Sequence, residues 1–438
     1  MSAYQTTQYQ SVGDTGNNYN TNNYGGNNYG DNNYGGNSSD NWNYNNTYNT
    51  ALNAQTGRSR RSKWIVIGSV VGIIALIAIG VGVGVSVANS HKSSKSSNLS
   101  SNSKSSNSGS SNSSVTQTDP SDPSTFVRNS SWTQAFYGIA YTPEGSQLPN
   151  CGNSLEQVIT DIQLMSQLTK RIRLYGADCN QSALVLEAIK QTKVDMTVFL
   201  ANYPIPTDGG AAYVRQRDLI QSALQTYGTD HVGGITVGNE YILDYLSDNG
   251  GSTLDPNGPV GNQGAALLLP NITDTINMVK GMGLNIPVGN SDAGSYFNNE
   301  VLAAVDYGMA NVHPWFAAES VQDGANWTET FFSTTNVAAA SALSNNPTMY
   351  IAETGWPTNS STAAAESDGP SNASVANLQI FLDTFVCAAN SAGTKYFFFE
   401  YFDEVWKDIQ FGGVEGYWGL FNADRTIKAI NIPTCTAP

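Results

Sequence analysis

The 438-residue chain has few of the residues that metal and phosphate chemistry require. Its only histidines are His91, His231 and His313, and no plausible histidine metal site can be assembled from them. No glycine-rich phosphate-binding loop follows a predicted strand, and the Gly-x-Ser-x-Gly motif of serine hydrolases is absent. These absences predict a protein that needs neither a metal nor another cofactor.

Basic residues are also scarce, with 20 Lys and Arg against 35 Asp and Glu in the whole chain. The imbalance is concentrated in residues 131–438, where 12 basic and 30 acidic residues give a net charge of −18. Such a charge disfavours nucleic acid or anionic lipid as a partner and suits a domain that acts on a neutral polymer.

The first 57 residues contain no Lys or Arg and almost no aliphatic side chains. Asn, Tyr, Gly and Thr dominate, and Asn-Asn-Tyr-Gly recurs at 22–25, 27–30 and 32–35. A segment of this composition cannot bury enough apolar surface to offset its chain entropy. Residues 1–63 are therefore predicted to be a disordered tail.

Residues 64–88 contain no charged side chain. As a helix these 25 residues would extend roughly 37 Å, enough to cross a bilayer. Arg58, Arg60, Arg61 and Lys63 crowd the N-terminal flank, which predicts a cytoplasmic tail and an exported C-terminal part. We expect a type II signal anchor in the plasma membrane, with the remainder of the chain facing the cell wall.

Residues 89–130 are rich in Ser and Asn and are predicted to form a stalk. Asn-x-Ser/Thr acceptor sites for glycosylation follow the anchor at Asn98, Asn112, Asn129, Asn180, Asn271, Asn326, Asn359 and Asn372. All the cysteines also follow it, at Cys151, Cys179, Cys387 and Cys435. In an oxidising compartment they predict two disulfides. Three pairings are possible, and proximity in the sequence favours Cys151–Cys179 with Cys387–Cys435.

Residues 131–438 alternate short apolar runs with amphipathic segments, which predicts a (β/α)8 barrel. A doubly wound sheet also alternates in this way, but it usually has fewer strands and a glycine-rich first turn. The predicted strands are 137–141, 171–176, 196–201, 234–237, 286–290, 309–313, 348–352 and 395–399.

Glu240 and Glu353 follow the fourth and seventh of these strands. Chemistry in such barrels takes place at the C-terminal strand ends, so both side chains are expected to reach one cleft. Two facing carboxyl groups are the equipment for cleaving a glycosidic bond: one acts as an acid, and the other attacks the sugar or activates water. The alternative is that each glutamate only pairs with a Lys or Arg at a strand end.

The segments IRLYGADCNQ, ITVGNEYI, VHPWF, IAETGWPT and FEYFDEVWK resemble those of glycoside hydrolase family 17, and most closely its membrane-anchored fungal β-1,3-glucanases. The resemblance covers essentially all of 131–438. It implies a (β/α)8 barrel and a mechanism that retains anomeric configuration. It also implies that Glu240 is the general acid/base and Glu353 the nucleophile, with their carboxyl groups about 5–5.5 Å apart.

The resemblance extends to other positions. Asn239 matches an asparagine near the sugar 2-hydroxyl, and Glu404, Lys407 and Glu415 match a charged cluster on the cleft side after the eighth strand. The alternative for that trio is a salt-bridged loop support. Tyr401 and Val405 depart from the family pattern, in which Ala and Pro are common, and this puts the loop shape in doubt.

Aromatic residues cluster near the predicted strand ends, where they can stack on the apolar faces of sugars. The ones expected to face the cleft are Tyr175, Tyr241, Trp315 and Trp356. His313 is either a substrate contact or, more commonly for such a residue, a hydrogen-bonded core histidine.

Together these features predict endo-hydrolysis of β-1,3-glucan in the cell wall by a monomeric catalytic domain. Two alternatives stay open. The same site could transfer glucan to another glucan chain, or the barrel could be a non-catalytic glucan-binding wall protein.

Overall fold

The computed structural model describes residues 115–251, 253 and 255–438. The predicted tail, the predicted anchor, residues 89–114 of the stalk, Asn98 and Asn112 lie outside the described residues. Among the residues that the structure describes, none of the helices combines the length and the apolar composition that a bilayer crossing needs.

Parallel strands close into a barrel in the order β1-β10-β7-β6-β5-β4-β3-β2, which confirms the predicted (β/α)8 architecture. The strands are β1 (Gly138–Ala140), β2 (Arg171–Arg173), β3 (Thr197–Asn202), β4 (Val232–Val237), β5 (Val288–Ala293), β6 (Tyr307–Asn311), β7 (Thr348–Thr354) and β10 (Tyr396–Phe398). A small antiparallel pair, β8 (Ser367–Asp368) and β9 (Ser371–Asn372), lies in the connection that follows β7.

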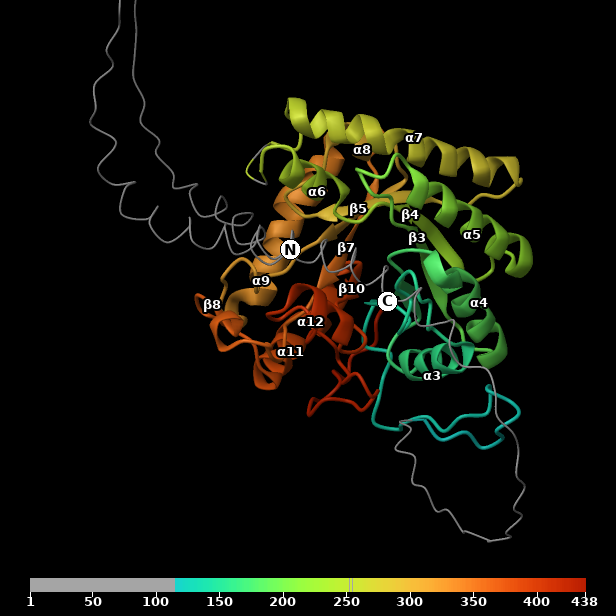
Figure 1. Ribbon diagram of the computed structural model, residues 1–438. Coiled ribbons are helices and arrows are strands. Elements are labelled where there is room, and N and C mark those ends of the chain that lie inside the picture. The colour runs from blue at the N-terminus through green and yellow to red at the C-terminus, as the bar shows by residue number, and fades with distance from the viewer. Residues whose placement is uncertain (1–114, 252, 254) are drawn as a thin grey trace, which may run out of the picture. The chain divides into compact units, whose positions relative to one another are not determined.

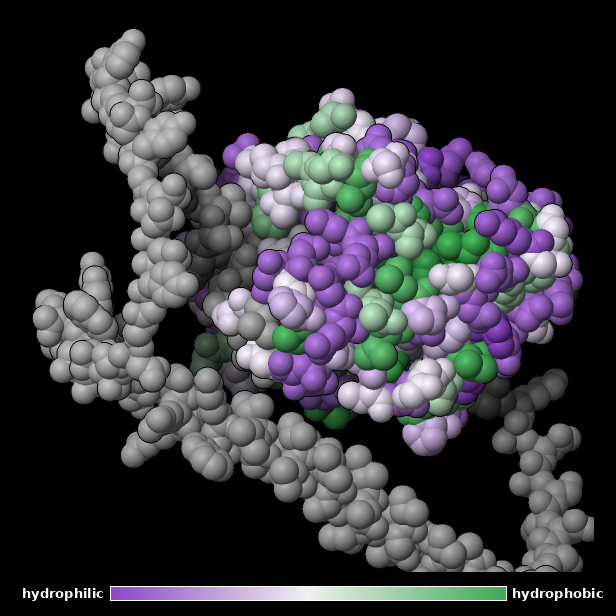
Figure 2. Space-filling view, turned by 90° about the horizontal axis from the view of Figure 1, so that it is seen from above, coloured by the Kyte–Doolittle hydropathy of each residue, from purple (hydrophilic) through white to green (hydrophobic). Residues whose placement is uncertain are grey.

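Helices surround the strands, and Figure 1 shows α3, α4, α5 and α7 following one another around the outside of the barrel. The longer helices are α3 (Leu155–Met165), α4 (Gln181–Thr192), α5 (Ala211–Tyr227), α6 (Tyr241–Asp248), α7 (Pro259–Gly281), α9 (Val321–Phe331) and α11 (Val375–Ala392). Shorter ones are α8 (Asn299–Leu302), α10 (Ala338–Ser341) and α12 (Val405–Phe411). Hydrophilic residues cover much of the face in Figure 2, with smaller hydrophobic patches between them.

Serine caps fix where three of the helices begin. Ser154, Ser320 and Ser374 precede α3, α9 and α11, and each hydroxyl accepts a hydrogen bond from the backbone amide three residues later. These bonds satisfy amides that have no partner within the helix. The sequence thus sets the helix starts locally, before any packing on the strands.

The barrel interior is filled by large side chains facing small ones. Phe199, Tyr307, Met309, Ala352 and Phe397 form a buried cluster inside the strands. A Cβ atom on Gly289 would lie 2.2 Å from the ring of Tyr307, so only glycine fits there. Side chains therefore fill the barrel interior up to the level of the C-terminal strand ends.

The fifth strand is longer and more polar than its prediction at 286–290. It runs to Ala293 and includes Asn290, Ser291 and Asp292, each no more than 1% exposed. Asn, Ser and Asp are common in turns, so the sequence pattern suggested that the strand ended here. Hydrogen bonds to neighbouring segments, described below, keep these residues in the strand.

Residues 115–130, which were predicted to belong to the stalk, are packed on the folded domain. The amide of Val127 donates to the carbonyl of Thr116, and the Gln163 side chain on α3 donates to the carbonyl of Pro123. Asp119 and Asp122 each accept a bond from the amide two residues later, which makes tight turns. The Ser- and Asp-rich composition hid these turns.

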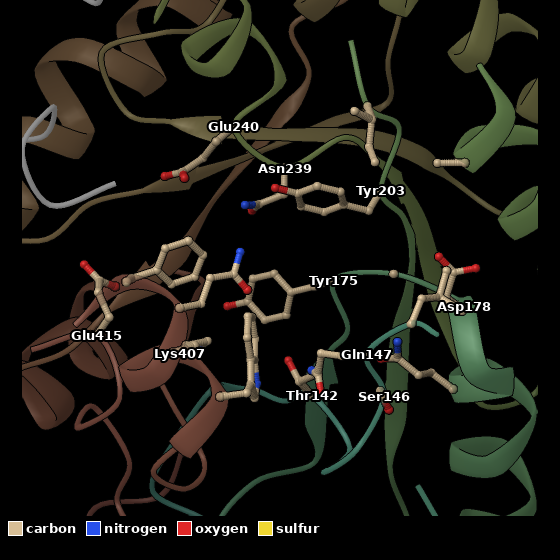
Figure 3. A pocket seen from close by; sticks show the side chains of 18 of the residues that line it. Thr142, Ser146, Gln147, Tyr175, Asp178, Tyr203, Asn239, Glu240, Lys407 and Glu415 are labelled. Carbon is tan, nitrogen blue, oxygen red and sulfur yellow. The ribbon is translucent and has the colours of Figure 1, made fainter. Parts of the chain in front are cut away.

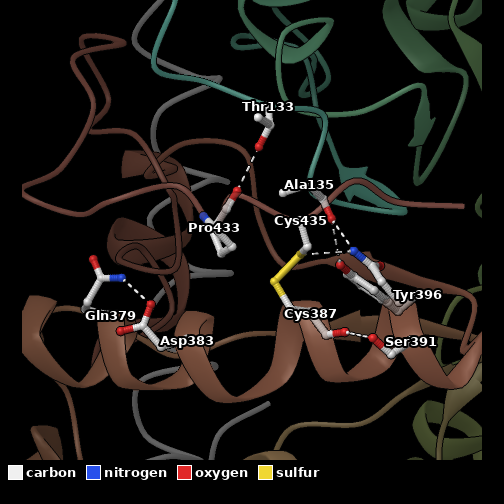
Figure 4. Close-up of a disulfide and its surroundings, with 10 residues drawn as sticks. Thr133, Ala135, Gln379, Asp383, Cys387, Ser391, Tyr396, Pro433 and Cys435 are labelled. Carbon is white, nitrogen blue, oxygen red and sulfur yellow. Dashed lines mark hydrogen bonds between the residues drawn. A yellow bond between two sulfur atoms is a disulfide. The ribbon is translucent and has the colours of Figure 1, made fainter.

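Both predicted disulfides are confirmed: Cys151 pairs with Cys179, and Cys387 pairs with Cys435. Figure 4 shows the second joining α11 to the C-terminal segment. In the same region the Thr133 hydroxyl donates to the carbonyl of Pro433 at 2.8 Å. The disulfide therefore fastens the C-terminal segment to α11, and the Thr133 bond joins the same segment to the residues that lead into β1.

The acceptor asparagines within the described residues lie at the surface. Asn129, Asn180, Asn326, Asn359 and Asn372 are exposed, and Asn271 is half-buried. Their glycosylation stays a prediction.

We predict that replacing Cys387 and Cys435 together by Ser lowers the free energy of unfolding by about 4 kcal/mol, because the bond closes a long loop in the unfolded chain. Urea unfolding measures the change. Ser391→Ala, one turn along α11 on its exposed side, serves as the control and should change stability by less than about 0.5 kcal/mol. Equal stabilities for the double variant and the control would contradict the prediction.

Candidate active site

A cavity of about 470 Å³ opens at the C-terminal ends of the barrel strands, and Glu240 and Glu353 both line it. Figure 3 shows the rings of Tyr175 and Tyr203 projecting into this cavity between Glu240 and Asp178. The structure thus brings the two predicted catalytic carboxyl groups into one site.

Glu240 lies in the turn between β4 and α6 and is 3% exposed. Its φ of +55° is in the left-handed region, which a residue with a side chain seldom adopts. Asn311 Nδ2 donates to Glu240 Oε1 at 3.1 Å. Burial, followed by the negative charges of Glu353 and Asp244, raises the pKa of Glu240 well above its usual range.

Glu353 is near the end of β7 and is 6% exposed. Burial alone would raise its pKa, but a hydrogen bond from His313 and the positive charge of Arg173 outweigh it, and the pKa of Glu353 is lowered. His313 Nε2 lies 3.1 Å from Glu353 Oε2, and Arg173 Nη1 lies 3.4 Å from Oε1. Because an ionised carboxylate only accepts, Nε2 of His313 carries the proton.

Arg173 on β2 connects these groups and is 1% exposed. Besides Glu353, its guanidinium donates to Asn311 Oδ1 at 3.4 Å and to Asn239 Oδ1 at 3.1 Å. A continuous path of hydrogen bonds therefore runs from Glu240 through Asn311 and Arg173 to Glu353. The guanidinium also lies over the Tyr175 ring, 4.4 Å from its centroid.

The two carboxyl groups thus have opposite pKa shifts although both are buried. Cationic and hydrogen-donating neighbours favour the charged form of Glu353, while acidic neighbours favour the neutral form of Glu240. One proton donor and one carboxylate in a shared cavity are the pair that cleavage of a glycosidic bond requires.

The charged cluster after the eighth strand is only partly in the cavity. Lys407 and Glu415 are among its lining residues, whereas Glu404 is not. Lys407 Nζ lies 2.5 Å from Glu400 Oε2 and 3.1 Å from Glu404 Oε2. Glu404 and Glu400 therefore fix the position of Lys407 in the cavity wall. For Glu404 this agrees with the alternative stated above, a salt-bridged loop support.

Of the four aromatic residues expected to face the cleft, Tyr175 lines the cavity and the other three do not. Trp356 is fully buried, and its indole donates to the carbonyl of Asn372. Trp315 is packed edge-on against Phe316, and Tyr241 is buried in the first turn of α6. Strand-end position alone does not say whether a ring turns toward the cleft or the core.

Other aromatic rings occupy the cavity walls instead. The lining includes Tyr203, Phe316, Phe399 and Trp406. The two departures from the family pattern lie outside the lining: Tyr401 donates from its buried hydroxyl to Asp161 Oδ1, and Val405 is exposed at the start of α12.

The sequence prediction missed Arg173, Asn311, Glu400 and the polar run of β5. A signal existed for Arg173, because a basic residue inside an apolar strand of a closed barrel must find buried acceptors. No comparable signal identified Asn311, since its partners come from other strands. Asn239, which was predicted, lies at the cavity with Arg173 and Ser291 as hydrogen-bond partners.

A closed parallel barrel with a glutamate at the end of β7 and another just beyond β4, facing one cavity, is the arrangement of a glycoside hydrolase. Residues 138–419 match the model of the BtgE/BtgC glycoside hydrolase domain, and the chain belongs to this family. This agrees with the resemblance to glycoside hydrolase family 17 noted in the sequence.

Two relatives illustrate the match. The chain is 33% identical over 322 residues to the glucan endo-1,3-beta-glucosidase btgC of Emericella nidulans, covering 69% of this chain and 46% of that protein. It is 32% identical over 332 residues to a btgC protein of Aspergillus niger, covering 72% and 46%. The chain thus aligns with about half the length of the curated relatives it matches.

Solved structures show the same fold. A glycoside hydrolase family 17 β-1,3-glucanosyltransferase from Rhizomucor miehei has a TM-score of 0.55 and 23% identity, covering 70% of this chain and all of that one. An endo-laminarinase from Formosa has a TM-score of 0.53 and 20% identity, covering 66% and 84%.

We predict that Glu353→Gln lowers the pKa of Glu240, because the substitution removes a negative charge that disfavours ionisation of its neighbour. Carbon-13 NMR titration of labelled carboxyl groups measures the shift. Glu319→Gln is the control, because neither Glu240 nor Glu353 is among the groups that shift the pKa of Glu319, and it should leave the Glu240 titration unchanged. A Glu240 pKa that stays the same or rises in Glu353→Gln would contradict the arrangement described here.

Proposed function

We propose that this protein hydrolyses β-1,3-glucan internally, with retention of anomeric configuration. The observation that carries the proposal is the shared cavity in which Glu240 has a raised pKa and Glu353 a lowered one. The substrate is supported by the curated relatives, which are named as glucan endo-1,3-beta-glucosidases.

In the first step the Glu353 carboxylate attacks the anomeric carbon while Glu240 donates its proton to the departing glycosidic oxygen. The bond between the anomeric carbon and that oxygen breaks, and a glycosyl ester of Glu353 forms. Glu240 is then ionised. In the second step it takes a proton from water, whose oxygen attacks the anomeric carbon and releases Glu353.

Arg173 and His313 act on Glu353 throughout this cycle. Their donors hold the carboxylate in one orientation at 3.4 and 3.1 Å, which reduces the ordering required for attack. They also favour the ionised form, so Glu353 is the better leaving group in the second step. Tyr175, Tyr203 and Trp406 supply rings for the apolar faces of the sugars.

The pKa shifts predict how turnover depends on pH. Activity requires Glu353 ionised and Glu240 protonated, so kcat/KM should fall below the lowered pKa of Glu353 and above the raised pKa of Glu240.

We predict that Glu240→Gln lowers turnover of glucan about 10²- to 10⁴-fold, the range that general acid–base catalysis contributes. Glu353→Gln should lower it by several orders of magnitude, because no covalent intermediate can form. Glu353→Ala with azide and a dinitrophenyl β-laminaribioside should give the α-glycosyl azide, and Glu240→Ala the β-glycosyl azide. Product NMR distinguishes the two anomers, and wild-type-like activity in both Gln variants would refute the assignment.

The products of wild-type protein test the other functions. We expect linear β-1,3-glucan oligosaccharides to give only shorter products, which hydrolysis requires. Products longer than the substrate would mean that a glucan chain intercepts the glycosyl ester in place of water. Binding of glucan without new reducing ends would instead indicate a non-catalytic wall protein.

We also propose that residues 64–88 anchor the protein in the plasma membrane with the barrel outside. The uncharged run and the basic cluster before it support this orientation. After removal of the wall, a C-terminal epitope should be accessible on intact cells, and an N-terminal epitope only after permeabilisation. The reverse pattern, or full release into the medium, would contradict the proposal.

A further inference from the structure

Three consecutive residues of β5 hold the turn that carries Glu240. Asn290 Nδ2 donates to the carbonyl of Val237 at 2.8 Å, at the end of β4. The backbone of Ser291 accepts from the amide of Glu240 at 3.2 Å and donates to the carbonyl of Gly238 at 3.3 Å. The turn is therefore bound to β5 on both sides of Asn239.

Asp292 completes this set at the start of α6. Its carboxylate accepts from the amide of Ile242 at 2.9 Å and from that of Leu243 at 3.4 Å. These amides lie in the first turn of α6, where the N-cap side chain commonly accepts them. Glu240 occupies the N-cap position, yet Asp292 on the neighbouring strand accepts these bonds instead.

Because Asp292, and not Glu240, accepts these bonds, the direction of the Glu240 side chain changes. A side chain that accepts from the first turn of its own helix folds back over the backbone. With Asp292 in that place, the Glu240 carboxyl group extends to Asn311 and lines the cavity. Asp292 is fully buried, and burial raises the pKa of its carboxyl group well above the usual range, although the bonds from the backbone amides favour the ionised form.

Resting on the function proposed above, we propose that Asp292 is a positioning residue for the general acid/base: it caps α6 from β5 and so holds Glu240 in its left-handed conformation with the carboxyl group directed into the cavity. It does not touch the substrate. Its effect is on proton donation to the leaving group and not on attack by Glu353.

Substrates that differ only in their leaving group test this assignment. Departure of a sugar hydroxyl needs the proton of Glu240, whereas dinitrophenolate leaves without one. For Asp292→Asn we expect kcat/KM on laminari-oligosaccharides to fall roughly 10- to 100-fold, part of the contribution of general acid catalysis. On dinitrophenyl β-laminaribioside, kcat/KM should stay within about threefold of wild type, because Glu353 is unaffected.

Two further variants keep the test decisive. Asp306→Asn is the matched control, because the Asp306 carboxylate also accepts a backbone amide of β5, that of Val288, at the end of the strand far from Glu240. This variant should leave kcat/KM unchanged on both substrates. Gly238→Ala disturbs the same turn by another route: φ is +91°, and a Cβ would lie 2.9 Å from Asn290 Nδ2. It should give the same leaving-group pattern as Asp292→Asn, even if that variant folds poorly.

The outcomes separate this inference from the proposed function. If Glu240→Gln shows the leaving-group pattern and Asp292→Asn and Gly238→Ala do not, the positioning role is wrong and the catalytic assignment stands. Equal losses on both substrates in Asp292→Asn would indicate general damage to the site and would also overturn the role. If Glu240→Gln itself affects neither substrate, the function proposed for Glu240 fails first.

Discussion

The buried guanidinium of Arg173 is the constraint on which the site depends. Removing such a charge from water costs several kcal/mol unless acceptors surround it. The barrel supplies them from β6, β7 and the turn after β4, through Asn311, Glu353 and Asn239. Because one planar group must satisfy all these acceptors together, the strands that carry them are fixed relative to one another at the level where both glutamates lie.

The same constraint explains how one barrel gives two carboxyl groups opposite properties. Burial disfavours the charged form of both. Glu353 lies next to the cation and to His313, so its charge is compensated. The Glu240 carboxyl group accepts from the neutral Asn311, and the negative charges of Glu353 and Asp244 disfavour its ionisation. The neighbours of each carboxyl group in the network therefore decide which of the two keeps its proton.

The sequence predicted the barrel and the two glutamates because both rest on local patterns. Eight apolar runs separated by amphipathic segments define the strands, and a charged residue at the end of such a run must lie at the barrel mouth. The direction of a side chain beyond the strand is not a local property. Trp356 turned out to be buried, whereas Tyr203 and Trp406 line the cavity, because loop geometry and helix packing decide which way each ring faces.

The polar run of β5 shows why the remaining part was missed. Read alone, Asn-Ser-Asp marks a turn, and a buried strand of such residues would be costly. The cost is offset because each residue has a partner in the turn that carries Glu240 or in the first turn of α6 that follows it. That turn is itself unfavourable, since a left-handed glutamate costs about 1 kcal/mol. The polar strand and the left-handed turn are thus each unfavourable alone. They stabilise one another through their contact in the folded barrel, which neither local sequence reveals.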